Sequence, residues 1–242
     1  MISLYGTTGA PPPLDELGDD EEIGRRRFDP RASARHCDVP ESELVVYNAQ
    51  RQVSQLQVRN PRTRAVEPDP RTVVLAIDGA CRRNGTAAAR GAWGVHFGPG
   101  SPLNARGLLD PALPQTNSRA EIEALVQAVR IVRESLLLRR RDMRHFRIRS
   151  DSGYLVQAMS EWIGDWNEAR GRNSRGRPVA HYRALKEIHD QLDEMSCGGG
   201  GRDFKFWYVP RDQNREADAL ANQSLDAASV PCLGPVDDLR SL

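Results

Sequence analysis

The feature that most constrains the fold is an almost unbroken apolar run, Thr72-Val-Val-Leu-Ala-Ile, which ends at the acid Asp78. An apolar run without polar alternation is typical of a central strand that is buried on both faces. Such strands belong to sheets that helices cover on both sides. The run therefore predicts an α/β domain with residues 72–78 at its centre.

The segments that follow alternate between strand-like and helix-like patterns. Short connections join the first three expected strands, which favours antiparallel pairing, whereas helices separate the later strands, which favours parallel crossovers. The expected fold class is α/β, with a mixed five-stranded sheet flanked by helices. Beyond residues 72–78, strands are expected at 91–97, 105–109, 146–150 and 204–209, and helices at 118–138, 154–162, 182–195 and 216–225.

The amino-acid composition changes sharply at both ends of this region. Residues 1–70 hold Pro-rich, Gly-rich and charged stretches, so we expect a largely disordered or irregular N-terminal extension. Within it, residues 43–58 fit either a short strand or a helix, because their periodicity does not decide. Residues 71–228 form the expected domain, and residues 229–242 are expected to be a loose tail.

Composition excludes several classes of protein. No apolar run reaches the roughly 18–20 residues of a membrane span, and the N-terminus lacks the pattern of a secretory signal. The four cysteines lie far apart, which favours reduced thiols in an intracellular protein, nuclear or cytoplasmic. Lys and Arg (34) balance Asp and Glu (33), but only Lys186 and Lys205 are lysines, and guanidinium groups suit phosphate.

Four acids stand at positions where one edge of the sheet could gather them. Asp78 and Asp151 follow expected strands, and Glu121 and Asp218 open expected helices. Each also has an ordinary explanation. Asp78 can begin a turn, Ser118-Arg-Ala-Glu121 is a capping-box pattern, and Asp218 can favour the helix dipole.

Together the four acids predict a metal site. Clustered carboxylates without a companion cation repel each other, so their convergence implies bound divalent metal. Oxygen ligands without His or Cys select Mg²⁺, with Mn²⁺ as a possible substitute, over Zn²⁺. Two such ions about 3.5–4 Å apart can activate water and stabilise the leaving oxygen of a phosphodiester.

Four segments, each centred on one acid, resemble in order the motifs of type 1 ribonuclease H. The resemblance covers roughly residues 72–226 and implies an endonuclease that cuts the RNA strand of RNA–DNA hybrids with two Mg²⁺ ions, leaving 3′-hydroxyl and 5′-phosphate ends. It places the catalytic, metal-binding acids at Asp78, Glu121, Asp151 and Asp218. The segments are Asp78-Gly-Ala-Cys-Arg-Arg-Asn-Gly, Gln115-Thr-Asn-Ser-Arg-Ala-Glu, Ser150-Asp-Ser-Gly-Tyr and Asn214-Arg-Glu-Ala-Asp-Ala-Leu-Ala.

The same resemblance implies the residues that hold the hybrid. Short amides near the metals would read the 2′-hydroxyl of RNA, although Asn84-Gly85 is also an ordinary turn signal. An acid-free Arg stretch beside paired Trp resembles the family's basic protrusion, which grips the DNA strand. The positions are Asn84, Gln115 and Asn117 for the RNA strand, Trp162, Trp166, Arg172 and Ser174 for the protrusion, and Thr116 and His181 for a phosphate pocket.

Two departures from the family pattern are visible. The segment Val209-Pro-Arg-Asp-Gln-Asn214 is short and lacks the histidine that many relatives carry there, so it resembles the shorter-loop branch. Gly171 stands where many relatives have a third Trp, which predicts weaker hybrid binding.

Two other functions remain open from the sequence. A hybrid- or RNA-binding module of the same fold that no longer cleaves would have no use for four repelling acids. A 3′–5′ exonuclease of similar fold would begin with Asp-x-Glu, whereas Asp78 precedes Gly79-Ala80. We expect a monomer whose partner is the RNA–DNA hybrid, without a membrane, and no protein partner is inferable.

Overall fold

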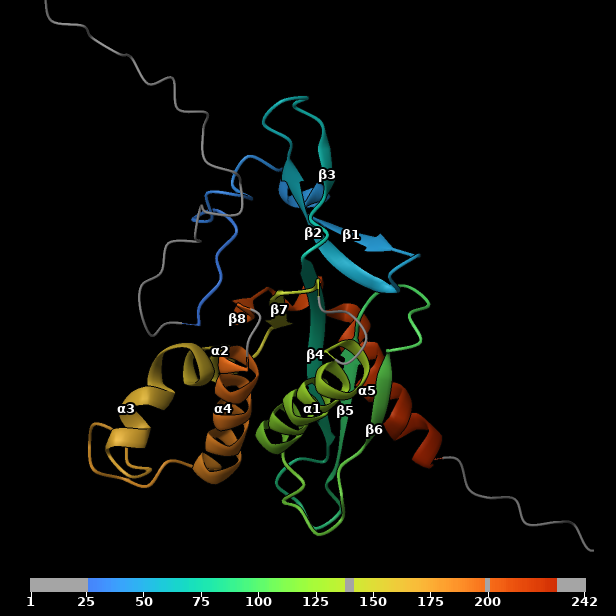
Figure 1. The fold of residues 1–242 in the computed structure, drawn as a ribbon. Coiled ribbons are helices and arrows are strands. Elements are labelled where there is room, and N and C mark those ends of the chain that lie inside the picture. Colours follow the sequence, from blue (N-terminus) through green and yellow to red (C-terminus); the bar gives the residue numbers. More distant parts are fainter. Residues whose placement is uncertain (1–25, 138–141, 199–200, 230–242) are drawn as a thin grey trace, which may run out of the picture.

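The computed structural model describes residues 26–137, 142–198 and 201–229. Within them, strands on both sides of one long strand form a mixed eight-stranded sheet (Figure 1). The strands are β1 (Val45–Asn48), β2 (Val53–Arg59), β3 (Val66–Pro68), β4 (Thr72–Arg82), β5 (Arg90–His96), β6 (Ala105–Leu108), β7 (His145–Ser150) and β8 (Asp203–Tyr208).

The predicted mixed sheet is confirmed, and it is larger than expected. Strand β4 pairs antiparallel with β5, which pairs antiparallel with β6, and on its other side β4 pairs parallel with β7, which pairs parallel with β8. The first eight residues of β4 are all buried, as the apolar run predicted.

The N-terminal region differs from the irregular extension that we expected. Strand β2 pairs with β1 and β3 and reaches β4 at Ser54 and Val74. The Ser54 amide also donates to the Phe97 carbonyl at 2.6 Å, so the hairpin continues the sheet where β5 ends. The domain limits inferred from the sequence stay a prediction, and residues 1–25 and 230–242 lie outside the described part.

The helices cover both faces of the sheet. Helices α1 and α4 pack against each other on one face, and α5 lies against β4, β5 and β6 on the other face (Figure 1). The predicted helix at 118–138 changes to a π-helical turn at Val132–Leu137, and a second π turn separates α2 from α3. The helices are α1 (Asn117–Ile131), α2 (Gly153–Gln157), α3 (Ile163–Glu168), α4 (Tyr182–Cys197) and α5 (Arg215–Ser229).

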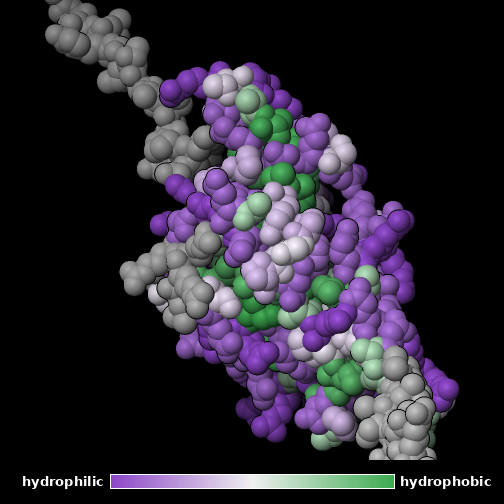
Figure 2. Space-filling model, turned by 90° about the vertical axis from the view of Figure 1, so that its right-hand side faces the viewer, coloured by the Kyte–Doolittle hydropathy of each residue, from purple (hydrophilic) through white to green (hydrophobic). Residues whose placement is uncertain are grey.

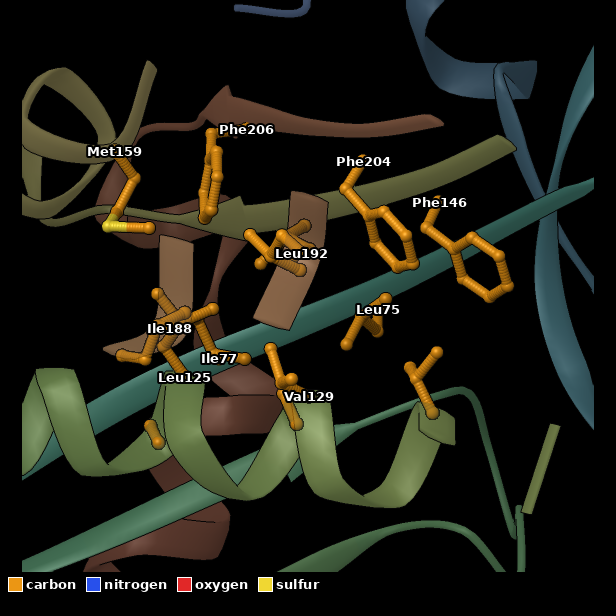
Figure 3. Packing of buried hydrophobic residues seen from close by; sticks show 14 of the residues in the cluster. Leu75, Ile77, Leu125, Val129, Phe146, Met159, Ile188, Leu192, Phe204 and Phe206 are labelled. Carbon is orange, nitrogen blue, oxygen red and sulfur yellow. The ribbon is translucent and has the colours of Figure 1, made fainter. Parts of the chain in front are cut away.

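Two apolar clusters hold the described residues together. The larger one joins β4 to α1 and α4 through residues such as Leu75, Leu125 and Leu192 (Figure 3). The smaller one combines Phe28, Val39, Leu44 and Leu56 from the N-terminal region with Val74, Trp207 and Val209.

The surface is mostly polar on the face that Figure 2 shows, with smaller hydrophobic areas between hydrophilic side chains. In the part of the chain that the structure describes, no helix is both long and apolar enough to cross a bilayer.

Candidate active site

The sequence predicted Asp78 at the end of a strand, whereas in the structure Asp78 lies within β4. The strand continues to Arg82 because β5 keeps pairing with it, from Ala76–His96 to Arg82–Arg90. Pairing with β7 stops earlier, at Ala76. The Asp78 side chain is only 8% exposed, and one carboxylate oxygen accepts the Gly79 amide at 2.7 Å.

Two glycines let two helices approach β4 and β5 very closely. A Cβ on Gly79 would lie 2.1 Å from the backbone nitrogen of Glu121, so α1 can reach this depth only against glycine. A Cβ on Gly94, which pairs with Asp78, would lie 2.3 Å from the carbonyl oxygen of Ala217 in α5. The helices that carry Glu121 and Asp218 are thus seated on either side of Asp78.

Glu121 has a different role from the capping box that its sequence pattern allowed. Thr116 is the N-cap of α1, and its hydroxyl accepts the Arg119 amide at 3.2 Å. Glu121 is therefore the fifth residue of the helix. Its carboxylate accepts from the Asn117 amide at 2.9 Å and from the Ser152 hydroxyl at 2.7 Å.

Asp151 and Asp218 are held by the segment that precedes α5. The buried amide of Asn214 donates to Asp151 and to the carbonyl of Ile77 in β4, each at 3.0 Å. Asp218 lies in the first turn of α5, as predicted, and pairs with the exposed Arg211 at 3.2 Å. Sequence reasoning missed Ser152, Asn214 and Arg211 as partners, although Asn214 begins a recognised motif.

All four acids line one hollow of about 330 Å³, here called the acidic hollow. Among the described residues, no three His, Cys, Asp or Glu side chains already form a closed set of metal ligands. The four acids share the lining of this hollow. Its lining is Asp78, Gly79, Ala80, Cys81, Arg82, Asn117, Glu121, Asp151, Ser152, Arg211, Asp218 and Asn222.

Two of the four acids, Asp78 and Glu121, have raised pKa values. Burial raises the pKa of Asp78 to about 8, and the nearby charges of Asp151, Asp218 and Glu121 add to the effect, against the Gly79 hydrogen bond. Burial also raises the pKa of Glu121, which Ser152 opposes. A cluster of four carboxyl groups in one hollow offers oxygen donors, which fit Mg²⁺ or Mn²⁺.

The three amides expected near the RNA strand are placed differently. Asn117 lines the acidic hollow. The Gln115 side chain accepts from the Gly91 amide and donates to the carbonyls of Asp110 and Leu113, each at 2.9 Å, so it clamps the loop before α1. Asn84 is exposed in the turn after β4 and does not line the acidic hollow.

The residues expected in the protrusion meet in a second hollow of about 680 Å³, here called the aromatic hollow. The rings of Trp162 and Trp166 lie 5.7 Å apart, and Tyr154, which sequence reasoning missed, lies 6.3 and 6.5 Å from them. The lining includes Trp162, Trp166, Arg172, Ser174 and His181, together with Tyr154 and Ser118.

Of the two residues expected in a phosphate pocket, His181 lines the aromatic hollow and Thr116 does not. His181 begins α4 in the left-handed region (φ 59°), and burial, helped by the charge of Arg119, lowers the pKa of its imidazole. Thr116 caps α1 and does not line the aromatic hollow. Gly171 has φ +82°, and a Cβ there would lie 2.5 Å from the Tyr182 ring, so this backbone excludes a Trp at that position.

Comparisons with known proteins agree on one family. The RNase H family model matches residues 70–226. Ribonuclease H1 of Mus musculus is 31% identical over 156 residues, which cover 63% of this chain and 50% of that protein. Ribonuclease H of Paracidovorax citrulli is 30% identical over 159 residues, which cover 64% of this chain and 95% of that protein. The chain thus spans about half the length of the mammalian relatives that it matches.

Solved structures of ribonucleases H1 are also similar to this chain. RNase H1 from the halophilic archaeon Halobacterium salinarum is 26% identical and similar over 64% of this chain and 98% of that chain, with a TM-score of 0.39. LC11-RNase H1 in complex with an RNA/DNA hybrid is 22% identical over 64% of this chain and 97% of that chain, with a TM-score of 0.44.

Proposed function

This chain belongs to the ribonuclease H family, and we propose that it is a divalent-metal-dependent endonuclease that hydrolyses the RNA strand of RNA–DNA hybrids. The observation that carries the proposal is the acidic hollow, which brings four carboxylates from β4, α1, the end of β7 and α5 to one place. Burial and the neighbouring acids raise the pKa of Asp78 to about 8, so its carboxylate form is costly without a cation, and a bound divalent ion would offset that cost.

Asp78, Glu121, Asp151 and Asp218 are the residues that would hold two Mg²⁺ ions. The chemistry that such ions supply is activation of water and stabilisation of the leaving oxygen, which yields 5′-phosphate and 3′-hydroxyl ends. The protein's own contribution is orientation. Ser152 fixes one oxygen of Glu121, and Asn214 fixes one oxygen of Asp151.

The hybrid would lie across both hollows. The aromatic hollow offers rings and the Arg172 guanidinium to the DNA strand, and the acidic hollow faces the RNA strand. Asn117 is the amide best placed for the RNA, because it already lies beside Glu121. The side chain of Gln115 acts through the loop that it clamps.

The test is cleavage of an end-labelled RNA–DNA hybrid with and without Mg²⁺, beside duplex RNA, duplex DNA and single-stranded RNA. We expect internal cuts in the RNA strand of the hybrid only, dependent on Mg²⁺ and absent in Asp78→Asn, which should still bind the hybrid. If Mn²⁺ also fails to elicit cleavage while the hybrid binds, the chain is a binding module of this fold and the proposal is wrong.

A further inference from the structure

The segment Pro210–Asn214 links β8 to α5 and joins two of the four acids. Asn214 donates to Asp151 at 3.0 Å, and the Asn214 carbonyl accepts the Asp218 amide at 3.2 Å. Any shift of this segment therefore moves both acids relative to Asp78. The contacts that hold this segment in place therefore affect the geometry of the candidate active site. An inference from these contacts rests on the proposed function.

Two side-chain contacts hold this segment to the sheet: Asn214 donates to the Ile77 carbonyl of β4, and Arg149 of β7 holds the residue before Asn214. The Arg149 side chain extends from β7, and its guanidinium lies 5.1 Å from the centre of the Trp207 ring, on the paired residue of β8. One of its terminal nitrogens donates to the Gln213 carbonyl at 2.6 Å, directly before Asn214. Arg149 thus connects the strand that ends at Asp151 to the segment that leads to Asp218.

Stability alone does not explain a guanidinium at this place. The Arg149 side chain is half-buried between Trp207 and the Gln213 carbonyl. Its Nε is buried without a hydrogen-bond partner among the described residues. A half-buried guanidinium with an unpaired buried nitrogen is a poor source of folding free energy compared with an apolar side chain of similar size.

The N-terminal region also contacts Trp207 and Gln213. Phe28 packs edge-on against Trp207, with ring centres 5.5 Å apart, and its amide donates to the Phe206 carbonyl at 2.9 Å. Glu41 accepts from the Gln213 side chain at 3.1 Å. Phe28 and Glu41, which lie outside the matched family region, therefore contact the same two residues that Arg149 contacts, Trp207 and Gln213.

We propose that Arg149 is a positioning residue for the active site. By fixing the Gln213 carbonyl it sets the segment Pro210–Asn214, and through Asn214 it sets the distance between Asp151 and Asp218. The N-terminal residues Phe28 and Glu41 support this geometry, so the region before residue 70 contributes to metal binding without touching the metal.

The test compares Arg149→Met with Arg147→Met. Arg147 lies two residues earlier on β7 and is 1% exposed, so it is a comparison arginine that is more deeply buried than Arg149. It pairs with Asp203, at the end of β8 that is far from the segment Pro210–Asn214. Its guanidinium also lies 4.8 Å from the centre of the Phe28 ring, and an apolar Met side chain keeps that space filled. Three quantities are measured without nucleic acid: the Kd of Mn²⁺ by calorimetry, hydrogen exchange of the amides of residues 211–214 in metal-free protein, and the Tm.

We expect Arg149→Met to weaken Mn²⁺ binding about tenfold and to speed exchange at residues 211–214, as loss of a residue that orients metal ligands does. Arg147→Met should lower the Tm but leave the Kd of Mn²⁺ within about twofold of wild type. Arg149→Lys keeps the charge without the planar fork, and should weaken Mn²⁺ by about threefold, which carries the test if the Met variant does not fold.

The inference is overturned if Arg149→Met keeps the wild-type Kd for Mn²⁺ and the wild-type rate of hydrogen exchange. If the Met variant does not fold, the same two results in Arg149→Lys overturn it. An equal loss of Mn²⁺ affinity in Arg147→Met overturns it as well. A wild-type protein that binds Mn²⁺ but does not cleave the hybrid would refute the proposed function and leave this inference standing, because none of its three measurements needs substrate.

Discussion

At the scale of single residues, the Asp78 carboxyl group affects both the stability of the metal-free protein and the candidate active site. Its pKa is raised to about 8, from an ordinary value of 3.8, by burial and by the neighbouring acids. Between these two pH values the folded protein binds the proton more tightly than the unfolded chain does. Asp78 therefore destabilises the metal-free fold progressively as the pH rises through this window.

Asp78→Asn removes that penalty, because the amide stays neutral. We predict that in EDTA the variant has a higher Tm than wild type at pH 8 and a much smaller gain at pH 5. Thermal melts followed by circular dichroism measure both gains. The exposed Glu134 provides a control, since Glu134→Gln should show no such pH-dependent gain. Equal gains for Asp78→Asn at both pH values would contradict the prediction.

The sequence indicated the four acids, but it did not indicate the residues that form hydrogen bonds with them. Asp78, Glu121, Asp151 and Asp218 were recognisable because each stands in an ordered motif, and all four line one hollow. Ser152 and Asn214 were not recognisable as their partners, because each hydrogen bond joins segments that meet only in the folded chain. Glu121 was open to a capping role until Thr116 proved to be the N-cap.

At the scale of secondary-structure elements, the close seating of α1 on β4 decides how far Glu121 lies from Asp78. We predict that Gly79→Ala lowers cleavage strongly and costs about 1–3 kcal/mol of unfolding free energy, because its Cβ would meet the Glu121 nitrogen at 2.1 Å. Urea denaturation and the rate of hybrid cleavage measure the two effects.

Gly164→Ala is the matched control for that variant. Gly164 is exposed in α3, and no atom lies within 4 Å of the position that a Cβ would take there. Alanine at this position should therefore be neutral or stabilising by up to about 1 kcal/mol. Full activity in Gly79→Ala would mean that α1 can shift without moving Glu121 away from Asp78.

The aromatic hollow gives a second prediction at this scale, since the π turn before α3, α3 itself and the segment after α3 all line it. Trp162 is the better probe of the two tryptophans, because Trp166 is only 8% exposed and its truncation would also damage the core. Trp162→Ala and Arg172→Ala should raise KM for the hybrid severalfold and leave kcat within about twofold. Steady-state kinetics at two salt concentrations measures this, and a defect confined to kcat would count against a binding role.

The strands that the sequence missed have a physical reason. In β2 the apolar alternation is broken by Gln55, which is fully buried and donates to the carbonyls of Asp69 and Thr72 at 3.0 and 3.2 Å. A buried polar residue that satisfies backbone carbonyls looks, in sequence, like an exposed one. The apolar run of β4 has no such interruption, and it was predicted correctly.

At the scale of the whole molecule, the question is whether residues 26–70 are a part of the fold or an attachment to it. Leu56 in β2 is fully buried in the smaller apolar cluster, together with Val74 of β4. Val74 stands between Val73 and Leu75, which belong to the larger cluster. The two clusters therefore share the central strand, and we expect them to unfold together.

Leu56→Ala and Leu125→Ala test this expectation, because both leucines are fully buried, one in each cluster. Each variant should lose about 2–5 kcal/mol of unfolding free energy and should unfold in urea in one transition that is the same by tryptophan fluorescence and by circular dichroism. Trp207 reports on the smaller cluster and Trp166 on the larger one. If Leu56→Ala instead loses part of its fluorescence signal at low urea while the helical signal stays intact, the N-terminal strands unfold separately. In that case they could not hold Trp207 and the segment before α5 against Arg149, and the active site would depend on the matched family region alone.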